Sequence, residues 1–336
     1  MKTKKEISLI VLNYNGRAHL EEYFTSVYKQ SLVPDEIIMM DNMSTDGSIE
    51  FVKQKFPNVI IVSENRFNLG TARASNVGFA HSTRDLVIFQ SNDLRLDKKC
   101  IESLVKEINK NNKIGIVTSV LVRYKPDSKG NWIVDNAGGI VDKYGFGMQK
   151  YPNELFSGIP QREEVFFSYG CSFIIKRSLF KQVNGFDERM FNLNEDFDLS
   201  WRVRQLGYKI IYTKKSFAYH KGSATLNFRE KPLKRYWAER NSIRMFLKNV
   251  STRHLLKIIP MYVILLFGEM AFFLYRGKFL MFWADCKAVL WNLRYIAETL
   301  QLRNKIQKSV KKNNIEKMIN NTSFKFMLFK VIKDTI

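Results

Sequence analysis

The chain has 336 residues, 45% of them hydrophobic and 13% aromatic, which excludes a disordered or collagen-like protein and allows a substantial core. Its three cysteines are far apart and follow no metal-ligand spacing, which argues against a disulfide framework or a zinc site. The formal net charge of +22 is uneven, because residues 1–200 carry 26 Lys and Arg against 25 Asp and Glu, whereas residues 201–336 carry 28 against 7. The basic C-terminal part is therefore expected to face a polyanion.

The first 120 residues alternate short β-branched runs with helical patterns. This alternation predicts a parallel sheet that helices cover on both faces. The predicted strands are residues 7–13, 36–41, 59–63, 86–91 and 115–122, and the predicted helices lie near residues 18–29, 46–55, 71–81 and 97–110.

The pattern changes after this alternation. Residues 124–168 contain six glycines and several aromatics, which predicts hairpins and loops that form a lid or an acceptor-facing insertion. A strand is expected at residues 172–175, and a helix with acidic residues at its start is expected to run through Gln205. From about residue 231 onward the sequence predicts helices only, so a soft boundary is placed there.

Polar residues follow three predicted strands at their carboxyl ends, where open α/β sheets bind ligands. Asn13 and Asn15 follow the first strand, Asp41 ends the second, and Asn92 and Asp93 follow the fourth. As binding residues, Asp41 would contact a ribose hydroxyl or base, and Asp93 would hold a divalent cation. The alternatives are a turn and helix cap for Asp41 and an ordinary loop carboxylate for Asp93.

Two further segments carry candidate binding residues. Asn68 and Gly70 precede a predicted helix, where a glycine lets backbone approach a ligand and the helix amides favour negative charge. His220 follows a short strand and could supply a metal ligand or a hydrogen bond to a diphosphate. Their alternatives are an ordinary loop-to-helix junction and a structural histidine.

Three carboxylates crowd the start of one predicted helix: Glu195, Asp196 and Asp198. Their number exceeds what complementing the helix dipole needs. Repulsion between like charges would raise one pKa toward the range that suits a general base. Asp196 is the candidate for that base.

Together these motifs resemble glycosyltransferase family 2, whose members have the GT-A fold, a Rossmann-like, mostly parallel sheet flanked by helices. The resemblance covers about residues 7–225. It is carried by the segments 10–15, 41–48, 68–70, 91–93, 185–188 and 195–199. The Gln-X-X-Arg-Trp signature of processive synthases is absent, and residues 235–244 are similar to a helix of rhamnosyltransferase-like members, which indicates one sugar transferred per encounter.

The resemblance implies an inverting transfer of a sugar from a nucleotide diphosphate donor to an acceptor hydroxyl, and the expected acceptor is a lipid-linked or surface glycan. Residues 1–230 would form the GT-A catalytic domain, with a nucleotide-sugar half at 1–123 and an acceptor half at 124–230. Residues 231–336 would form a helical region that associates with membranes.

The resemblance also assigns roles to the candidate residues. Asp41 would bind the nucleotide, Asp93 a divalent metal, and Asp196 would be the catalytic base. The remaining residues are Asn13, Asn15, Asn68, Gly70 and Asn92 for the donor, His220 for the metal, and Glu195, Asp198 and Trp201 for the acceptor or for support. Because the usual Asp-X-Asp reads Ser-Asn-Asp at 91–93, Mn²⁺ or Mg²⁺ would depend on the diphosphate and water for its other ligands.

Residues 258–275 form an apolar run that contains Pro260, Gly268 and Glu269 and is at the lower limit for spanning a bilayer. A re-entrant or surface-lying helical pair is favoured over a crossing because Glu269 would be costly in a span. The alternative is a pair of core helices, packed on the catalytic domain or on a second subunit. The last 36 residues hold nine Lys and Arg against two acidic residues, which favours anionic lipid headgroups.

The expected partners are the sugar nucleotide, the acceptor glycan and an anionic membrane surface, without nucleic acid, and a homo-oligomer through the C-terminal helices is possible. The expected location is the cytoplasmic face of a membrane, because residues 1–6 are charged and no signal-peptide pattern follows. Two alternatives remain. A sugar nucleotidyltransferase would need a Gly-rich loop with a lysine near residue 15, and a degenerate transferase that only binds polyanions would leave the acidic cluster at 195–198 unexplained.

Overall fold

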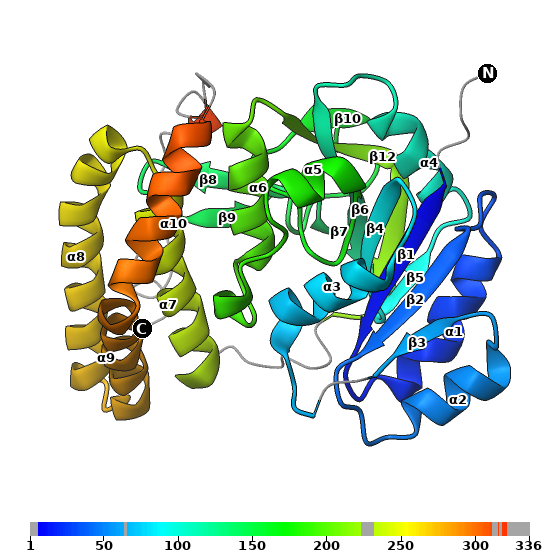
Figure 1. Ribbon diagram of the computed structural model, residues 1–336, viewed down its shortest axis with the longest axis horizontal. Coiled ribbons are helices and arrows are strands. Elements are labelled where there is room, and N and C mark those ends of the chain that lie inside the picture. Colours follow the sequence, from blue (N-terminus) through cyan, green and yellow to red (C-terminus); the bar gives the residue numbers. More distant parts are fainter. Residues whose placement is uncertain (1–5, 64–65, 223–231, 311–314, 316–317, 321–336) are drawn as a thin grey trace.

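The computed structural model describes residues 6–63, 66–222, 232–310, 315 and 318–320. One large sheet runs through the N-terminal part, and helices gather at the opposite end of the molecule (Figure 1). These C-terminal helices are α7 (Pro232–Asn249), α8 (Thr252–Tyr275), α9 (Phe279–Arg294) and α10 (Ile296–Ser309). Most of the basic tail expected to attract lipid, from residue 311 on, lies outside the described residues.

The large sheet has the strand order β10-β12-β6-β11-β4-β1-β2-β3. Its strands are β1 (Ile7–Asn13), β2 (Glu36–Asp41), β3 (Ile60–Val62), β4 (Leu86–Ser91), β6 (Ile114–Arg123), β10 (Arg162–Glu164), β11 (Ser172–Lys176) and β12 (Lys209–His220). Strands β3, β2, β1 and β4 pair in parallel, whereas β11 lies antiparallel between β4 and β6. The sheet is therefore mostly parallel in the first half, as predicted, but mixed as a whole.

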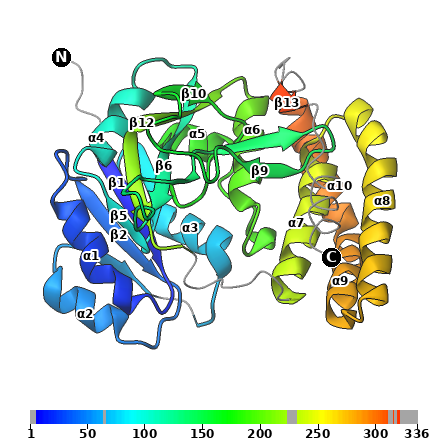
Figure 2. The ribbon, with the colours of Figure 1, turned by 180° about the vertical axis from the view of Figure 1, so that it is seen from behind.

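Helices cover both faces of this sheet, as the alternation predicts (Figures 1 and 2). One face carries α1 (Arg17–Tyr28), α2 (Ser48–Lys55) and α4 (Cys100–Ile108), and the other carries α3 (Gly70–His81), α5 (Arg177–Gln182) and α6 (Glu195–Gln205). Along β1, Leu9 and Val11 face the first set of helices and Ile10 faces the second, because successive side chains of a strand alternate. Burial on both faces explains the continuous apolar run of this strand.

The glycine-rich segment forms short strands, as expected. They are β7 (Val134–Asn136), β8 (Gly139–Asp142) and β9 (Gly147–Gln149), and a further short strand, β5 (Leu94–Leu96), pairs with β12. β8 and β9 form a small antiparallel hairpin, to which β13 (Ile319–Asn320) adds in parallel. This hairpin lies between the large sheet and the C-terminal helices (Figure 2).

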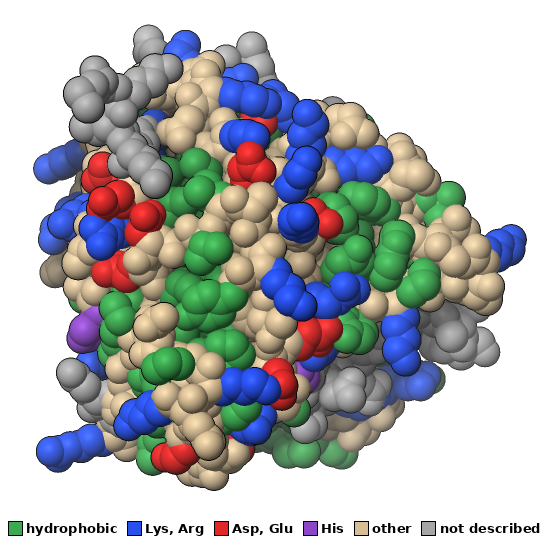
Figure 3. All heavy atoms as spheres, turned by 90° about the vertical axis from the view of Figure 1, so that its right-hand side faces the viewer, with side chains coloured by type: hydrophobic (Ala, Val, Ile, Leu, Met, Phe, Trp, Pro, Cys, Tyr) green, Lys and Arg blue, Asp and Glu red, His purple; other side chains and the backbone are tan. Residues whose placement is uncertain are grey.

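The C-terminal helices share a hydrophobic core with the sheet-containing part. Phe246 of α7 and Tyr262 of α8 belong to the same buried cluster as Phe166, Phe197 and Trp201. The helices therefore pack firmly against the region that contains α6. On the face at the other end of the molecule, basic side chains lie among acidic ones, in keeping with the balanced charge of the N-terminal part (Figure 3).

Candidate active site

The carboxyl ends of β1, β2 and β4 meet at Asn13. Its Nδ2 donates to Asp41 Oδ1 and to Ser44 Oγ, each at 2.9 Å, and its Oδ1 accepts from Asn92 Nδ2 at 2.6 Å. Asn13 and Asp41 are buried. Three of the predicted donor-binding residues are thus brought together at one edge of the sheet, because β1 pairs with both β2 and β4.

Asp41 and Asn15 shape the loop that follows β2. Asp41 Oδ2 accepts from the backbone N–H of Ser44 at 2.8 Å, so both of its carboxylate oxygens are hydrogen-bonded within the protein. This agrees with the alternative in which Asp41 stabilises a turn. Asn15 Oδ1 accepts from the backbone N–H of Thr45 at 2.8 Å. A nucleotide contact by either side chain would use their remaining lone pairs and stays a prediction.

Asn68 and Gly70 are held by Asn42, a residue that was not singled out from the sequence. Asn42 Nδ2 donates to Asn68 Oδ1 at 2.9 Å, and Asn42 Oδ1 accepts from the backbone N–H of Leu69 at 2.7 Å. Gly70 has a φ of +72°, and a Cβ placed there would lie 2.4 Å from the carbonyl oxygen of Phe191. The glycine therefore allows close approach of the Phe191 backbone, and the contact with a ligand expected from the sequence stays a prediction.

Asp93 faces His220 across the end of β12. Asp93 Oδ2 lies 3.2 Å from His220 Nε2, and His220 Nδ1 lies 2.8 Å from Asp135 Oδ2. Burial disfavours a charged ring, but the hydrogen bonds with Asp135 and Asp93 outweigh it and raise the pKa of His220 above its ordinary value. Asp135 was not predicted from the sequence.

The geometry at Asp93 suits a weakly ligated cation. Asp93 Oδ1 is buried and has no hydrogen-bond partner, so a cation would satisfy it. A carboxylate on the second ring nitrogen, as Asp135 provides for His220, is the usual support of a metal-binding histidine. To ligate a metal, His220 would have to release the proton on the Nε2 that faces Asp93, because a protonated ring nitrogen has no lone pair to offer. No cluster of three His, Cys, Asp or Glu that could hold a metal occurs among the described residues. A bound metal would therefore take most of its ligands from a diphosphate and water, as the sequence predicts.

Glu195 and Asp196 begin α6; Glu195 is buried, whereas Asp196 is half-buried and lies against Gly170, just before β11. Asp196 Oδ2 accepts from the backbone N–H of Gly170 at 2.7 Å, and its Oδ1 accepts from that of Phe197 at 2.7 Å. Burial raises the pKa of Asp196 to about 6. Burial first and the neighbouring Asp196 second raise the pKa of Glu195, whose Oε2 has no hydrogen-bond partner. Desolvation is thus the main cause of both shifts, and the charge crowding expected from the sequence is secondary.

The other two candidates of α6 point away from Asp196. Asp198 Oδ2 accepts from Arg202 Nη2 at 2.7 Å, and its Oδ1 lies 2.8 Å from Lys248 Nζ of α7. Trp201 is only 3% exposed and packs against Phe166. Both positions suit support of α6 and exclude a direct contact of Trp201 with an acceptor.

Backbone contacts connect Asp196 to the segment that contains Asp93. Ser91 N–H donates to the carbonyl of Cys171 at 2.9 Å, and Gly170, which binds Asp196, is the preceding residue. Asn92 and Asp93 follow Ser91 directly, so the candidates of β1, β2, β4 and α6 form one contiguous region. A separate cavity of about 820 Å³, lined by residues of α3, α5, α6 and α10, contains none of the candidate residues.

The arrangement defines a class of protein, a GT-A fold with a polar sheet edge and an acidic pair at the start of α6. Residues 8–183 match glycosyl transferase family 2, more than half of the chain, so the chain belongs to this family, as the sequence indicates. It is an inverting glycosyltransferase that uses a nucleotide sugar.

Several curated relatives of the chain are rhamnosyltransferases. The O-antigen chain rhamnosyltransferase WbaN of Salmonella anatum is 29% identical over 224 residues, which are 65% of this chain and 67% of that protein. The N-acetylglucosaminyl-diphospho-decaprenol L-rhamnosyltransferase of Mycobacterium tuberculosis is 25% identical over 243 residues, which are 65% of this chain and 77% of that protein.

Solved structures confirm the fold. GalNAc-T7 with UDP, GalNAc and Mn²⁺ has a TM-score of 0.56 at 17% identity, and the match covers 74% of this chain and 48% of that chain. The mannosyltransferase PcManGT from Pyrobaculum calidifontis, in complex with GDP-Man and Mn²⁺, has a TM-score of 0.50 at 17% identity over 87% of this chain and 88% of that chain.

Proposed function

We propose that the transfer is a direct displacement in which Asp196 is the general base. One observation carries this assignment: Asp196 is a half-buried carboxylate of raised pKa, close to the sheet edge that presents Asn13, Asp41 and Asp93. A base of raised pKa accepts a proton better than an ordinary carboxylate and is still ionised at neutral pH. Asp196 would take the proton of the acceptor hydroxyl as its oxygen attacks the anomeric carbon from the face opposite the leaving diphosphate.

The donor would lie along the sheet edge, where Asn13 and Asp41 would orient the nucleoside. Asp93 and His220 would hold a divalent cation, which supplies charge neutralisation for the leaving diphosphate when bound. The partnerless Oδ1 of Asp93 supports this assignment.

The substrates we propose follow the names of the relatives. Those names specify rhamnosyl transfer, and one specifies an N-acetylglucosaminyl-diphospho-polyprenol acceptor. We infer that the donor is a nucleotide diphosphate rhamnose and that the acceptor is a lipid-linked glycan that receives a single sugar.

A lipid-linked acceptor requires that the enzyme reach a membrane, and α8 and α9 present a surface for it. Among the described residues, α8 is the one helix long and apolar enough to cross a bilayer, and it continues through Pro260. Glu269, the costly residue of the apolar run, faces inward and lies 2.6 Å from Arg235 of α7. The large apolar side chains exposed on α8 and α9 are Leu256, Ile259, Val263, Ile264, Phe267, Leu274, Tyr275, Phe279, Leu280, Trp283, Leu290 and Leu293.

We therefore propose that this outer face lies on an anionic membrane at its cytoplasmic side, with α7 holding the inner face. The basic surplus of the C-terminal part supports an anionic surface. The double variant Ile264→Ser with Phe267→Ser should lose sedimentation with phosphatidylglycerol vesicles, whereas Leu155→Ser, an exposed apolar residue of the insertion, should sediment as the unchanged protein does. Equal sedimentation of the double variant would contradict the proposal. So would a dimer of the unchanged protein that the double variant no longer forms, because the face would then be a contact between two copies of the chain.

The transferase proposal is tested by a thermal-shift screen against UDP, GDP and dTDP sugars with and without Mn²⁺. We expect a nucleotide diphosphate rhamnose to raise the melting temperature more with Mn²⁺ than without it. Asp93→Asn should remove the Mn²⁺ dependence of that shift. A donor shift that Mn²⁺ and Asp93→Asn both leave unchanged would overturn the metal site.

A further inference from the structure

The loop of residues 189–194, here termed the base loop, directly precedes Glu195 and Asp196. Three of its residues have a positive φ although none is glycine: Phe191 at 59°, Leu193 at 72° and Asn194 at 66°. Such conformations are strained in residues other than glycine and persist only where the surrounding structure holds them. The base loop therefore needs external support.

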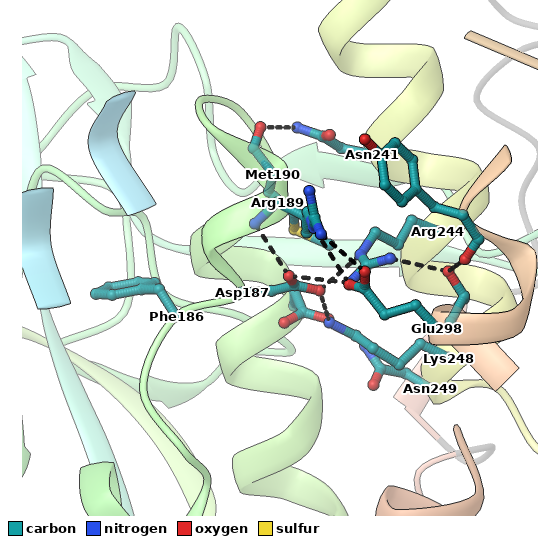
Figure 4. Close-up of polar contacts among 12 residues, drawn as sticks. Phe186, Asp187, Arg189, Met190, Asn241, Arg244, Lys248, Asn249 and Glu298 are labelled. Atoms are coloured by element: carbon teal, nitrogen blue, oxygen red, sulfur yellow. Dashed lines mark hydrogen bonds and ion pairs between the residues drawn. The ribbon is translucent and has the colours of Figure 1, made fainter. Parts of the chain in front are cut away.

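Helix α7 supplies that support through Asn241. Its Nδ2 lies 2.8 Å from the carbonyl oxygens of Met190 and Asn192 and 2.7 Å from that of Leu193. Asn241 is fully buried, and Arg240 donates to its Oδ1 at 3.0 Å. In Figure 4 the amide of Asn241 points from α7 at the carbonyl of Met190. The two N–H groups of one side chain thus serve three backbone carbonyls of the base loop, so one N–H is shared between two of them.

Arg240 adds a second contact from the same helix. Its Nη2 donates to the carbonyls of Met190 at 2.8 Å and Arg189 at 3.1 Å. Ser242 follows on α7, and its Oγ accepts from Asn194 Nδ2 at 3.1 Å, next to the first residue of α6. Three consecutive residues of α7 therefore hold the base loop along its whole length.

An ion-pair network fixes α7 itself to the segment before the loop. Asp187 Oδ2 lies 2.8 Å from Arg244 Nε and 2.5 Å from Lys248 Nζ, and Glu298 of α10 lies 2.9 Å from Arg244 Nη2 (Figure 4). Although burial alone would raise it, Lys248 and Arg244 hold the pKa of Asp187 well below its ordinary value. The network holds α7 and α10 against the segment of residues 185–188.

The opposite side of the base loop contacts the donor side of the site. The carbonyl of Phe191 accepts from Ala72 N–H at 3.2 Å, and Thr71 Oγ1 donates to Asn192 Oδ1 at 3.2 Å. Both partners lie in the first turn of α3, next to Gly70. The base loop thus joins the start of α3 to the start of α6, so its position sets the separation of donor and base.

We propose that Asn241 and Arg240 are positioning residues of the transfer reaction, which hold the base loop so that Asp196 meets the acceptor hydroxyl beside the donor. This assignment rests on the proposed role of Asp196. It gives the C-terminal helices a part in catalysis that is separate from their contact with a membrane.

The test compares Asn241→Ala with Asn292→Ala. Asn292 of α9 is a matched control, because it is also buried and its Nδ2 also donates to two backbone carbonyls, those of Arg240 and Ala288, without contacting the base loop. Both variants should lose a similar amount of thermal stability. Both are assayed well below their melting temperatures, with nucleotide diphosphate rhamnose and N-acetylglucosaminyl-diphospho-polyprenol.

We expect Asn241→Ala to lower kcat about 10- to 100-fold while the KM for the donor changes less than about threefold, because a small misplacement of a catalytic group acts on the transition state. Asn292→Ala should retain kcat. Hydrogen exchange adds a readout that needs no substrate. The exchange rate of the base-loop amides should rise in Asn241→Ala and stay the same in Asn292→Ala. Equal kcat and equal exchange in the two variants would overturn the proposal.

Two further variants separate the possible failures. Ser242→Ala removes one hydroxyl from the half-buried face of α7, so it tests the contact with Asn194 even where Asn241→Ala does not fold, and it should lower kcat several-fold. Unchanged kcat and exchange in Ser242→Ala would count against the proposal. If Asp196→Asn keeps full activity, the proposed base is wrong. If Asp196→Asn is inactive while Asn241→Ala behaves as Asn292→Ala, only the positioning role is wrong.

Discussion

The donor edge and the base end of the site are built in different ways. At the donor edge, Asn13 bonds to both Asp41 and Asn92, and each of the three is placed by the strand end at which it lies. At the base end, Asp196 is placed by a loop that contacts α7 about fifty residues later in the chain. The donor edge therefore depends on strand pairing, whereas the base end depends on the C-terminal helices.

The difference between binding and chemistry should be largest for Asp196→Asn. We expect the transfer rate to fall by a factor of about 10² to 10⁴, the usual contribution of a general base. Donor binding, measured by calorimetry, should change little because Asp196 lies at the other end of the site. If Asp196→Asn has the transfer rate of the unchanged enzyme, Asp196 is not the general base.

The dependence of the base end on α7 predicts a second large effect, on stability. Arg244→Met leaves Asp187 buried with one partner fewer, which should cost about 3–5 kcal/mol of unfolding free energy in urea titrations. Arg189→Met removes an exposed pair with Glu298 and should cost less than about 1 kcal/mol. Equal losses in the two variants would show that the network around Asp187 does not hold the helices.

Gly70→Ala tests the contact between the start of α3 and the base loop. Gly47 has a similar φ of +77° but open space around its Cβ position, so Gly47→Ala should cost only about 1 kcal/mol. Gly70→Ala adds a clash with the carbonyl of Phe191 and should cost about 1–3 kcal/mol more. Thermal unfolding of both variants measures the difference, and equal melting temperatures would contradict the close contact of Gly70 with the base loop.

The pH dependence of kcat gives the smallest predicted effect. A base must be deprotonated, so kcat should rise with pH through the raised pKa of Asp196, near 6, and be lost below it. Glu195 on the same helix and Tyr169 beside Gly170 lie in the same cluster, and the pKa of each is raised, so both stay protonated when Asp196 ionises. A kcat profile that is flat down to pH 4 would contradict a base with a raised pKa.

The sequence predicts the donor edge well, because alternation and turn residues are local signals. The strands 7–13, 36–41 and 86–91 match the structure at both ends, and α6 runs to Gln205 as expected. The direction of β11 was not predicted, since periodicity does not determine strand orientation.

The residues that sequence reasoning missed act over long separations. Asp135 reaches His220 across 85 positions, and Asn241 reaches Met190 across 51, so neither leaves a local pattern. The main cause of the raised pKa at Asp196 was also missed, because desolvation depends on tertiary packing. Helix 235–244 was recognised as a motif, but its contact with the base loop needs the folded chain.

The position of a bound nucleotide tests the account most directly. A crystal structure with Mn²⁺ and the nucleoside diphosphate that stabilises the protein in the screen should place the nucleoside beside Asn13 and Asp41 and the metal on Oδ1 of Asp93. Density for the nucleotide in the 820 Å³ cavity, among Phe180, Gln205 and Lys305, would contradict it.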